Sequence, residues 1–270
     1  MGHFEKFKSY IPFDLLEPRN FLVACAVLFG ILVVRYFLMA GAFWYLFYRL
    51  KPGVLQQRQI YKNLPAATIQ LYEIKWSLLT GLPFTMGALA MGVMWQKGWT
   101  LIYLSFDQYG LWYLIPSLLI LSVVHDFYFY VTHRFLHTSW AYRRFHSVHH
   151  NSLTPSPWAS FSFHPIEALI QAAALPLLIL IIPLHPVMIL IYLTFMTLSG
   201  ITNHLGFEIL PEGSEKGLGK WLVSGVHHTQ HHRYYRYNYG LFYTFWDRIF
   251  KTEHPKFPEE FRQVFEKKSV

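Results

Sequence analysis

Histidine is the residue type in this sequence whose number and spacing point to chemistry. Thirteen of the 15 histidines lie between His125 and His232. Three clusters with HxxxH or HxxHH spacing stand out: His133 and His137, then His146, His149 and His150, then His228, His231 and His232. Residues i, i+3 and i+4 of a helix lie on one face, so each cluster should present its imidazoles towards one point.

Neutral imidazole is a good ligand for iron, zinc or copper. Eight such ligands exceed what one ion can use and suit two. The sequence lacks the HExxH of zinc metalloproteases, the paired ExxH motifs of soluble di-iron bundles, and the GxGxxG and Walker motifs of nucleotide-binding proteins. An all-nitrogen site beside a membrane fits iron that activates dioxygen to attack a C–H bond, although the spacing alone leaves the metal open. No segment resembles a redox domain, so an external donor must supply electrons.

The composition indicates a membrane protein. Hydrophobic residues make up 53% of the 270-residue chain and charged residues 14%, about half the share in ordinary soluble domains. The net charge of +8 is better explained by anionic lipid headgroups than by nucleic acid, because the charges flank apolar runs. The single cysteine, Cys25, lies inside an apolar run and excludes a disulfide framework or a cysteine-rich metal site.

The apolar runs predict an all-α integral membrane protein with about four transmembrane helices in two hairpins. We expect spans at residues 21–48, 77–95 and 109–124, and a membrane hairpin at residues 168–200 that turns between Pro183 and Pro186. The opening residues 1–20 suggest a short interfacial segment without the features of a signal peptide. Arg35 interrupts the first run, which leaves open a functional site, a snorkelling side chain or an earlier helix end.

The loop charges predict the orientation. The polar segment at residues 50–75 is rich in Lys and Arg, whereas the turn near Lys97 carries Trp95 and Trp99 and one basic residue. The positive-inside rule places the segment at residues 50–75 on the cytoplasmic side. The third span should return the chain there just before His125, so that a histidine-rich helical cap lies in the cytoplasm.

Longer motifs resemble the fatty acid hydroxylase/sterol desaturase superfamily over residues 122–252, with a weaker likeness at 50–75. They are the segment 125–137, the HxxHH at His146, and Phe163-His-Pro-Ile-Glu167. The segments 227–232, 237–240 and 245–248, with Trp158-Ala-Ser and the Pro183-Leu-His-Pro turn, are most similar to the sterol C-5 desaturase branch. Phe161 departs from that branch, which usually has histidine there, and Leu205 stands where relatives tend to have an acidic residue.

Together the apolar runs and the resemblance predict one membrane-embedded domain over residues 1–270, with N-terminal transmembrane helices at 21–124 and a catalytic region at 125–252 that includes the membrane hairpin at 168–200. The resemblance implies two iron ions, O2 as co-substrate, an external donor such as a cytochrome b5 or a ferredoxin, and removal of two hydrogens from a sterol ring. Hydroxylation of a fatty acyl chain, a carotenoid or another lipid remains an alternative, because both reactions begin with the same hydrogen abstraction. A membrane metal-binding or transport protein is a further alternative, disfavoured by the arginines around the histidines.

The resemblance also implies the site residues. The expected metal ligands are His133, His137, His146, His149, His150, His164, His204, His228, His231 and His232. Asp126, His227 and Asp247 are expected to support them, since a carboxylate that accepts an N–H from a ligating imidazole fixes its tautomer. Lys267-Lys268 near the C-terminus resembles a dilysine retrieval signal. The expected location is the endoplasmic reticulum in a eukaryote and the inner membrane in a bacterium.

Overall fold

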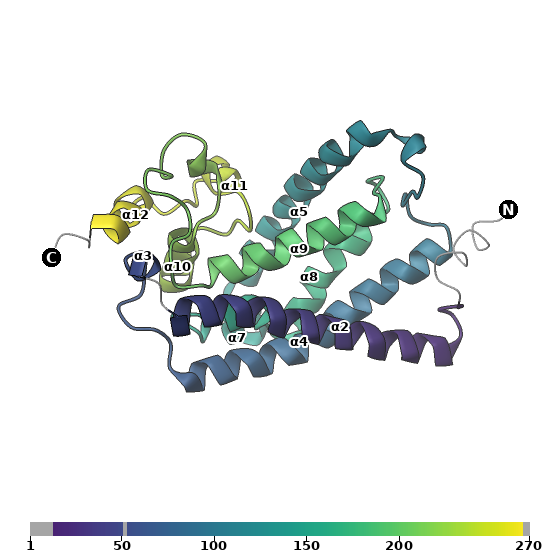
Figure 1. The fold of residues 1–270 in the computed structure, drawn as a ribbon, viewed down its shortest axis with the longest axis horizontal. Coiled ribbons are helices and arrows are strands. Elements are labelled where there is room, and N and C mark those ends of the chain that lie inside the picture. The colour runs from purple at the N-terminus through teal and green to yellow at the C-terminus, as the bar shows by residue number, and fades with distance from the viewer. Residues whose placement is uncertain (1–12, 51–52, 267–270) are drawn as a thin grey trace.

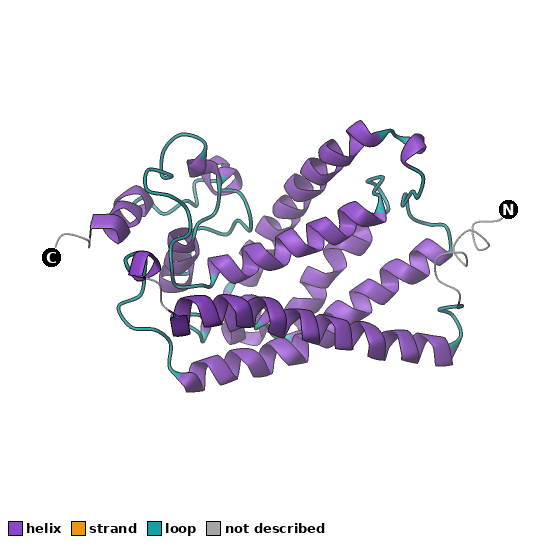
Figure 2. Ribbon diagram, viewed as in Figure 1, coloured by secondary structure: helices purple, strands orange, loops and turns teal. Residues whose placement is uncertain are grey.

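The computed structural model describes residues 13–50 and 53–266. In this part of the chain the regular elements are helices, joined by loops and three isolated β-bridges (Figure 2). Four helical segments are long and apolar enough to cross a membrane: α2 (Pro18–Trp44) with the π-helical turn η1 (Tyr45–Leu50), α4 (Ala67–Gln96), η3 (Leu111–Tyr113) with α5 (Leu114–Leu136), and α9 (Pro186–Asn203). The predicted fold class is confirmed.

The surface of these helices explains why they need a membrane. Leu22 and Leu38 on α2 are each 68% exposed, and Leu190 on α9 is 65% exposed. Exposure of these apolar side chains to water would be unfavourable in free energy. A helix satisfies its own backbone hydrogen bonds and can therefore face lipid. The exposed apolar faces are therefore lipid-facing surfaces.

Figure 1 shows the long helices side by side and a cap of shorter helices at one end of the bundle. The helix α8 (Pro165–Leu178) forms a hairpin with α9, and its turn packs against the α4–α5 connection. There the N–H of Leu101 donates to the carbonyl of Ile179 at 2.9 Å, and the N–H of Tyr103 donates to Leu184 at 3.1 Å. The hairpin thus reaches the end of the bundle that lies away from the cap.

The remaining elements are short and lie mainly at the bundle ends and in the cap. They are α3 (Gly53–Gln56), η2 (Phe106–Gln108), α6 (Ser139–Ala141), η4 (Tyr142–His146), α7 (Ser147–His150), η5 (Pro157–Phe161), η6 (Gly219–Trp221), α10 (Gly225–Tyr234), α11 (Phe245–Ile249) and α12 (Phe257–Glu266). The apolar residues Val226, Phe257 and Phe261 join α10 to α12 in a small core of their own. This core holds the cap together.

One predicted boundary was wrong. Helix α4 begins at Ala67, so Lys75 lies within a helix with its side chain exposed rather than in the preceding loop. Helix α5 continues beyond the third expected span to Leu136, and His125, Asp126 and His133 are buried within it. The expected interfacial segment falls largely on residues 1–12, which lie outside the described residues, and α2 begins at Pro18.

Candidate metal centre

Nine histidines gather into two groups at the cap end of the bundle. The five-histidine group consists of His133, His137, His146, His150 and His231, and the four-histidine group consists of His149, His204, His228 and His232. Within each group the candidate ligand nitrogens lie within 4.8 Å of one another. Eight of the nine residues are buried and His137 is partly buried. Each group could hold one metal ion.

The two HxxHH clusters divide between these groups, which corrects the expectation that each cluster converges on one point. His146 and His150 belong to the five-histidine group, whereas His149 belongs to the other. In α10 the pair His228 and His232 joins the four-histidine group, and His231 joins the five-histidine group. With 3.6 residues per turn, positions i and i+4 differ by about 40° around the axis and positions i+3 and i+4 by about 100°. Neighbouring histidines such as His149 and His150 therefore point towards different groups.

The nitrogen–nitrogen distances in the five-histidine group suit a shared ion. Nε2 of His137 lies 2.9 Å from Nε2 of His146, 3.2 Å from that of His150 and 3.1 Å from that of His231. Two imidazoles bound to one ion at about 2.1 Å and at right angles would have their nitrogens about 3.0 Å apart. The observed distances match this arrangement.

The four-histidine group has the same spacing. Nε2 of His204 lies 2.9 Å from that of His228 and 3.3 Å from that of His149. His232 completes the group, with its Nε2 3.0 Å from Nε2 of His228. The ligands come from the end of α9, from α7 and from α10, so this group joins the membrane helices to the cap.

Five of the nine imidazoles have an acceptor on their Nδ1 side. The partners are the carbonyls of Tyr239 for His133, Ser162 for His149, Gly200 for His204 and Tyr237 for His231, and the carboxylate of Glu167 for His146, at 2.6–3.2 Å. An oxygen acceptor requires the ring proton on Nδ1, which leaves a lone pair on Nε2. Lone pairs that face one another at about 3 Å repel unless a cation lies between them. The donor set therefore fits a metal ion in each group.

Burial keeps these rings neutral and ready to bind a metal. Removal from water lowers the pKa of His146, His149, His150, His231 and His232 well below the ordinary histidine value, and the neighbouring imidazoles lower it further. A protonated imidazole cannot donate a lone pair, so the depressed pKa values preserve ligands at neutral pH.

Glu167 is a site residue that the sequence analysis missed. Its Oε1 lies 2.7 Å from Nδ1 of His146, and both side chains are almost fully buried. The residue closes the Phe163-His-Pro-Ile-Glu167 motif and stands in the first turn of α8. A buried carboxylate at the start of an apolar helix was the available signal, because such a group needs a polar partner.

Asp126 and Asp247 support the centre through the backbone rather than by contacting an imidazole, which corrects their expected role. Oδ1 of Asp126 accepts from the N–H groups of Leu241 and Phe242, at 3.0 and 2.7 Å. Asp247 accepts from the N–H of Tyr239 and of Gly240, both at 2.8 Å. Together the two carboxylates fix residues 239–242.

Fixing this segment matters because the carbonyl of Tyr239 accepts from His133. Burial raises the pKa of Asp247 to about 6, and the hydrogen bonds from Thr252, Tyr239 and Gly240 oppose that rise. The two carboxylates therefore hold the backbone whose carbonyl contacts His133, rather than contacting an imidazole as predicted.

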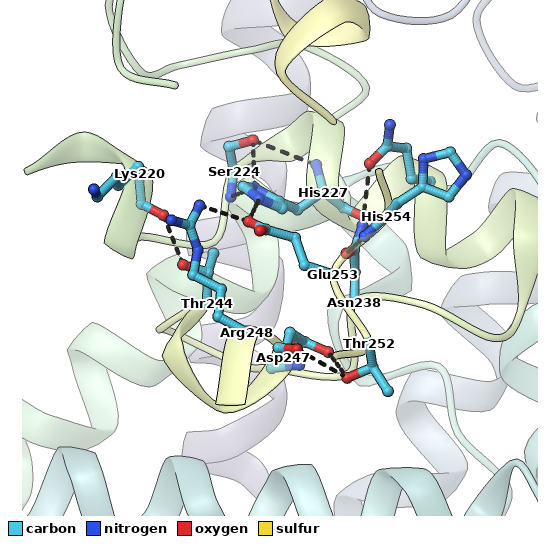
Figure 3. Close-up of polar contacts among 12 residues, drawn as sticks. Lys220, Ser224, His227, Asn238, Thr244, Asp247, Arg248, Thr252, Glu253 and His254 are labelled. Atoms are coloured by element: carbon cyan, nitrogen blue, oxygen red, sulfur yellow. Dashed lines mark hydrogen bonds and ion pairs between the residues drawn. The ribbon is translucent and has the colours of Figure 1, made fainter. Parts of the chain in front are cut away.

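His227 caps α10 from the side that packs on α12. Its Nδ1 lies 3.2 Å from the N–H of Ser224 and 3.1 Å from the Ser224 hydroxyl, which completes a capping box. Its ring stacks on Phe257 with centroids 3.4 Å apart, and Nε2 lies 3.6 Å from Oε1 of Glu253 (Figure 3). His227 thus stabilises the helix that carries three ligands.

His164 lies in neither histidine group. Its Nδ1 accepts from the N–H of Ile166 at 3.2 Å and caps the start of α8. Glu208, four residues after His204, accepts from the N–H groups of Leu210 and Val226. Both side chains bind backbone N–H groups rather than joining a histidine group, and we leave them out of the proposed ligand set.

An apolar cavity lies between α2, α4, α5, α8 and α9 and ends beside the histidines. Its lining is mainly apolar, with Leu, Phe, Met, Ala and Gly, and includes polar side chains such as Arg35, Gln171 and Thr197. Phe129 and Phe163 line it, and their rings lie 5.0 Å from that of His133 and 4.9 Å from that of His149. One aromatic ring therefore lies between the cavity and a histidine of each group.

The fold and this centre define an integral membrane protein with two groups of histidines that could each hold a metal ion. The fatty acid hydroxylase family model matches residues 118–252, half of the chain, so the chain belongs to the fatty acid hydroxylase family. The predicted resemblance to this superfamily is confirmed.

The curated relatives that this chain matches include sterol desaturases. Human lathosterol oxidase is 36% identical over 141 residues, which are 52% of this chain and 46% of the relative. A Delta(7)-sterol 5(6)-desaturase of Saccharomyces cerevisiae is 31% identical over 248 residues, 90% of this chain and 63% of the relative. A Delta(7)-sterol 5(6)-desaturase of Schizosaccharomyces pombe is 32% identical over 182 residues, which are 66% of this chain and 58% of the relative. The chain thus spans about half to two thirds of these relatives, whose names agree with the predicted branch. No solved structure matches it.

Proposed function

We propose that this protein is a di-iron oxidoreductase of a membrane that uses O2 to introduce a double bond into a sterol, at the position between C5 and C6. The proposal rests on one observation: two groups of converging imidazoles stand at the end of an apolar cavity between membrane helices. The relatives named as sterol 5(6)-desaturases and lathosterol oxidase support the substrate class and the bond.

The proposed ligands are the nine histidines of the two groups. A pair of bound iron ions supplies the activation of O2 that attack on an unactivated C–H bond requires. The protein contributes lone pairs held in place by the Nδ1 acceptors, of which Glu167 and the carbonyls of Tyr239 and Tyr237 serve the five-histidine group. Neutral ligands leave the centre with a high positive charge, which the carboxylate of Glu167 partly offsets.

The apolar cavity is the proposed substrate site. A sterol is a rigid apolar body, and a cavity lined by aliphatic and aromatic side chains binds such a body and excludes water from it. Phe129 and Phe163 lie between the cavity and the histidines and would pack against the ring that reacts. Exclusion of water protects the reaction from side reactions.

Electrons would come from an external donor, such as a cytochrome b5 or a ferredoxin, that docks on the cap. Arg143, Arg144, Arg233 and Arg236 are exposed and adjoin the histidine clusters. A cluster of positive charges accelerates association with an acidic partner. The basic segment between α2 and α4, with Arg58 and Lys62, supports a cytoplasmic position of this cap, in the endoplasmic reticulum of a eukaryote or the inner membrane of a bacterium.

Hydroxylation of a fatty acyl chain, a carotenoid or another lipid is the alternative within the family. Transport of metal ions is less well supported, because transporters place ligands near the middle of the membrane. Here His137 follows the end of α5 and His204 follows the end of α9. Ligands at helix ends and under a cap suit a fixed centre.

Lipid profiling of a host that accumulates Δ7-sterols, with and without the gene, tests the proposal. We expect a 5,7-diene sterol with the wild type and none with His149→Ala or His231→Ala at equal protein level in the membrane. His164→Ala is the matched control, since this histidine lies in neither group, and should retain product. A hydroxylated lipid in place of the diene would favour the alternative, and product from both ligand variants would refute the metal assignment.

A further inference from the structure

Arg35 stands near the middle of the long apolar span formed by α2 and η1, with its side chain partly buried. It lies 15 residues before Leu50 and 17 residues after Pro18 in one continuous helical segment. At 1.5 Å per residue, each end is roughly 20 Å or more away, further than an arginine side chain can reach. The helix does not end earlier and the side chain does not snorkel, so those two explanations fail.

The guanidinium has neutral partners from α9. Its Nη2 donates to the carbonyl of Leu193 and to the hydroxyl of Thr197. None of the ion pairs found among the described residues includes Arg35. An unneutralised cation within a membrane span is costly, and it usually marks a place where something binds. The other N–H groups of the guanidinium remain to serve a ligand.

Arg35 lines the apolar cavity, where its neighbours are largely aliphatic and aromatic. Thr197, which it contacts, precedes His204 by seven residues along α9, so about 10 Å separates them along the helix axis. In a sterol the hydroxyl stands on the ring adjoining the one that carries C6. An anchor at this distance would let the hydroxyl bind Arg35 while the C5–C6 bond lies beside the histidines.

We propose that Arg35 binds the hydroxyl oxygen of the sterol substrate and so sets which carbon atoms face the metal centre. This inference rests on the proposed function. It assigns to Arg35 a role in substrate recognition: the guanidinium donates an N–H to the oxygen, while its bond to α9 holds the side chain in the cavity. The class of ligand is a rigid apolar lipid with one hydroxyl at its end.

Equilibrium binding to the purified, metal-loaded protein in lipid nanodiscs, without O2, tests this role apart from turnover. The probes are a Δ7-sterol, the same sterol without its 3-hydroxyl, and a long-chain fatty acid. Loss of a hydrogen bond from a charged donor should weaken binding of the hydroxylated sterol to Arg35→Met by roughly tenfold to a hundredfold. Binding of the deoxy sterol should change little.

Two further variants make the test specific. Thr197→Val removes one of the two contacts that hold the guanidinium on α9 and leaves the Leu193 carbonyl, so it should weaken binding of the hydroxylated sterol less than Arg35→Met does. Arg35→Lys keeps a cation in the cavity and should retain part of that preference, which provides a measurement if the methionine variant does not fold.

Equal weakening of both sterols in the Arg35 variants would mean that the residue only shapes the cavity, and would overturn the inference. So would unchanged binding, or Arg35-dependent binding of the fatty acid instead of the sterol. The proposed function is judged separately: absence of diene from the wild type in the lipid profile refutes it, whereas diene from the wild type with Arg35-independent binding refutes only the role of Arg35.

Discussion

The hydrogen bond between Glu167 and His146 provides the sharpest test of how the five-histidine group is built. Glu167→Gln keeps the size of the side chain and an acceptor oxygen but removes the negative charge. In the wild type Nδ1 of His146 donates to Oε1 at 2.7 Å, and the two side chains are 1% and 2% exposed. Water cannot compensate for the lost charge at a site this deeply buried, so the substitution should lower the affinity of the five-histidine group for its metal ion.

The size of the effect follows from the type of hydrogen bond. A hydrogen bond to a charged group contributes about 1.5–3 kcal/mol and one between neutral groups about 0.5–1.5 kcal/mol. The difference, on the order of 1–1.5 kcal/mol, corresponds to about a tenfold change in affinity. Glu167→Ala, which removes the acceptor, should approach the hundredfold loss that the removal of such partners can cause.

Competition for Fe(II) with a chelator of known affinity, on purified protein, measures this change. Glu208→Gln is the matched control, because Glu208 is a buried carboxylate that accepts from the N–H of Leu210 and of Val226 rather than from an imidazole. We expect the control to bind iron like the wild type. Wild-type affinity in Glu167→Gln, in a protein of native helicity, would refute the idea that this carboxylate tunes the centre.

Three more outcomes are expected. His149→Ala and His150→Ala should each keep about one iron per chain, because adjacent residues serve different groups; two retained ions in both variants would contradict the division. Burial would raise the pKa of Glu253, but the nearby His227 and the hydrogen bond from Arg248 lower it, so its stabilisation is complete above its ordinary value of 4.5 and is lost as pH falls through the lowered value. The difference in unfolding midpoint between wild type and Glu253→Gln should accordingly shrink below about pH 4.5, and a constant difference would contradict the assignment. Chelation of the metal should lower the thermal midpoint and reloading should restore it, since a ligand of the folded state stabilises it; an unchanged midpoint in calorimetry would argue against bound metal.

The histidine spacing predicted eight of the nine residues that gather, because metal ligands on a helix must share a face, and the family resemblance added His204. His164, also taken from the resemblance, lies in neither group. The spacing could not predict their division. Whether His149 turns towards His146 or towards His204 depends on where α9 ends relative to α7, and that is a property of the packed bundle rather than of the HxxHH motif.

The supporting residues were harder to predict because their partners are distant in sequence. Asp126 meets the N–H groups of Leu241 and Phe242, more than 100 positions away. Four of the five Nδ1 acceptors for which the structure gives a partner are backbone carbonyls, which no side-chain pattern marks. The role of Glu167 becomes visible only once α8 packs against the turn that carries His146.

The placement of the ligands has a consequence for how the cap and the membrane helices work together. The five-histidine group takes His133 from α5 and His231 from α10, and the four-histidine group takes His204 from the end of α9 and His228 from α10. Each proposed ion would therefore link the cap to the bundle. Because the apolar cavity ends at Phe129 and Phe163, between these same helices, the substrate and the metal would meet where the two parts are joined. In the proposed function a lipid would enter this centre from the membrane side, and the electron donor would approach the exposed arginines of the cap.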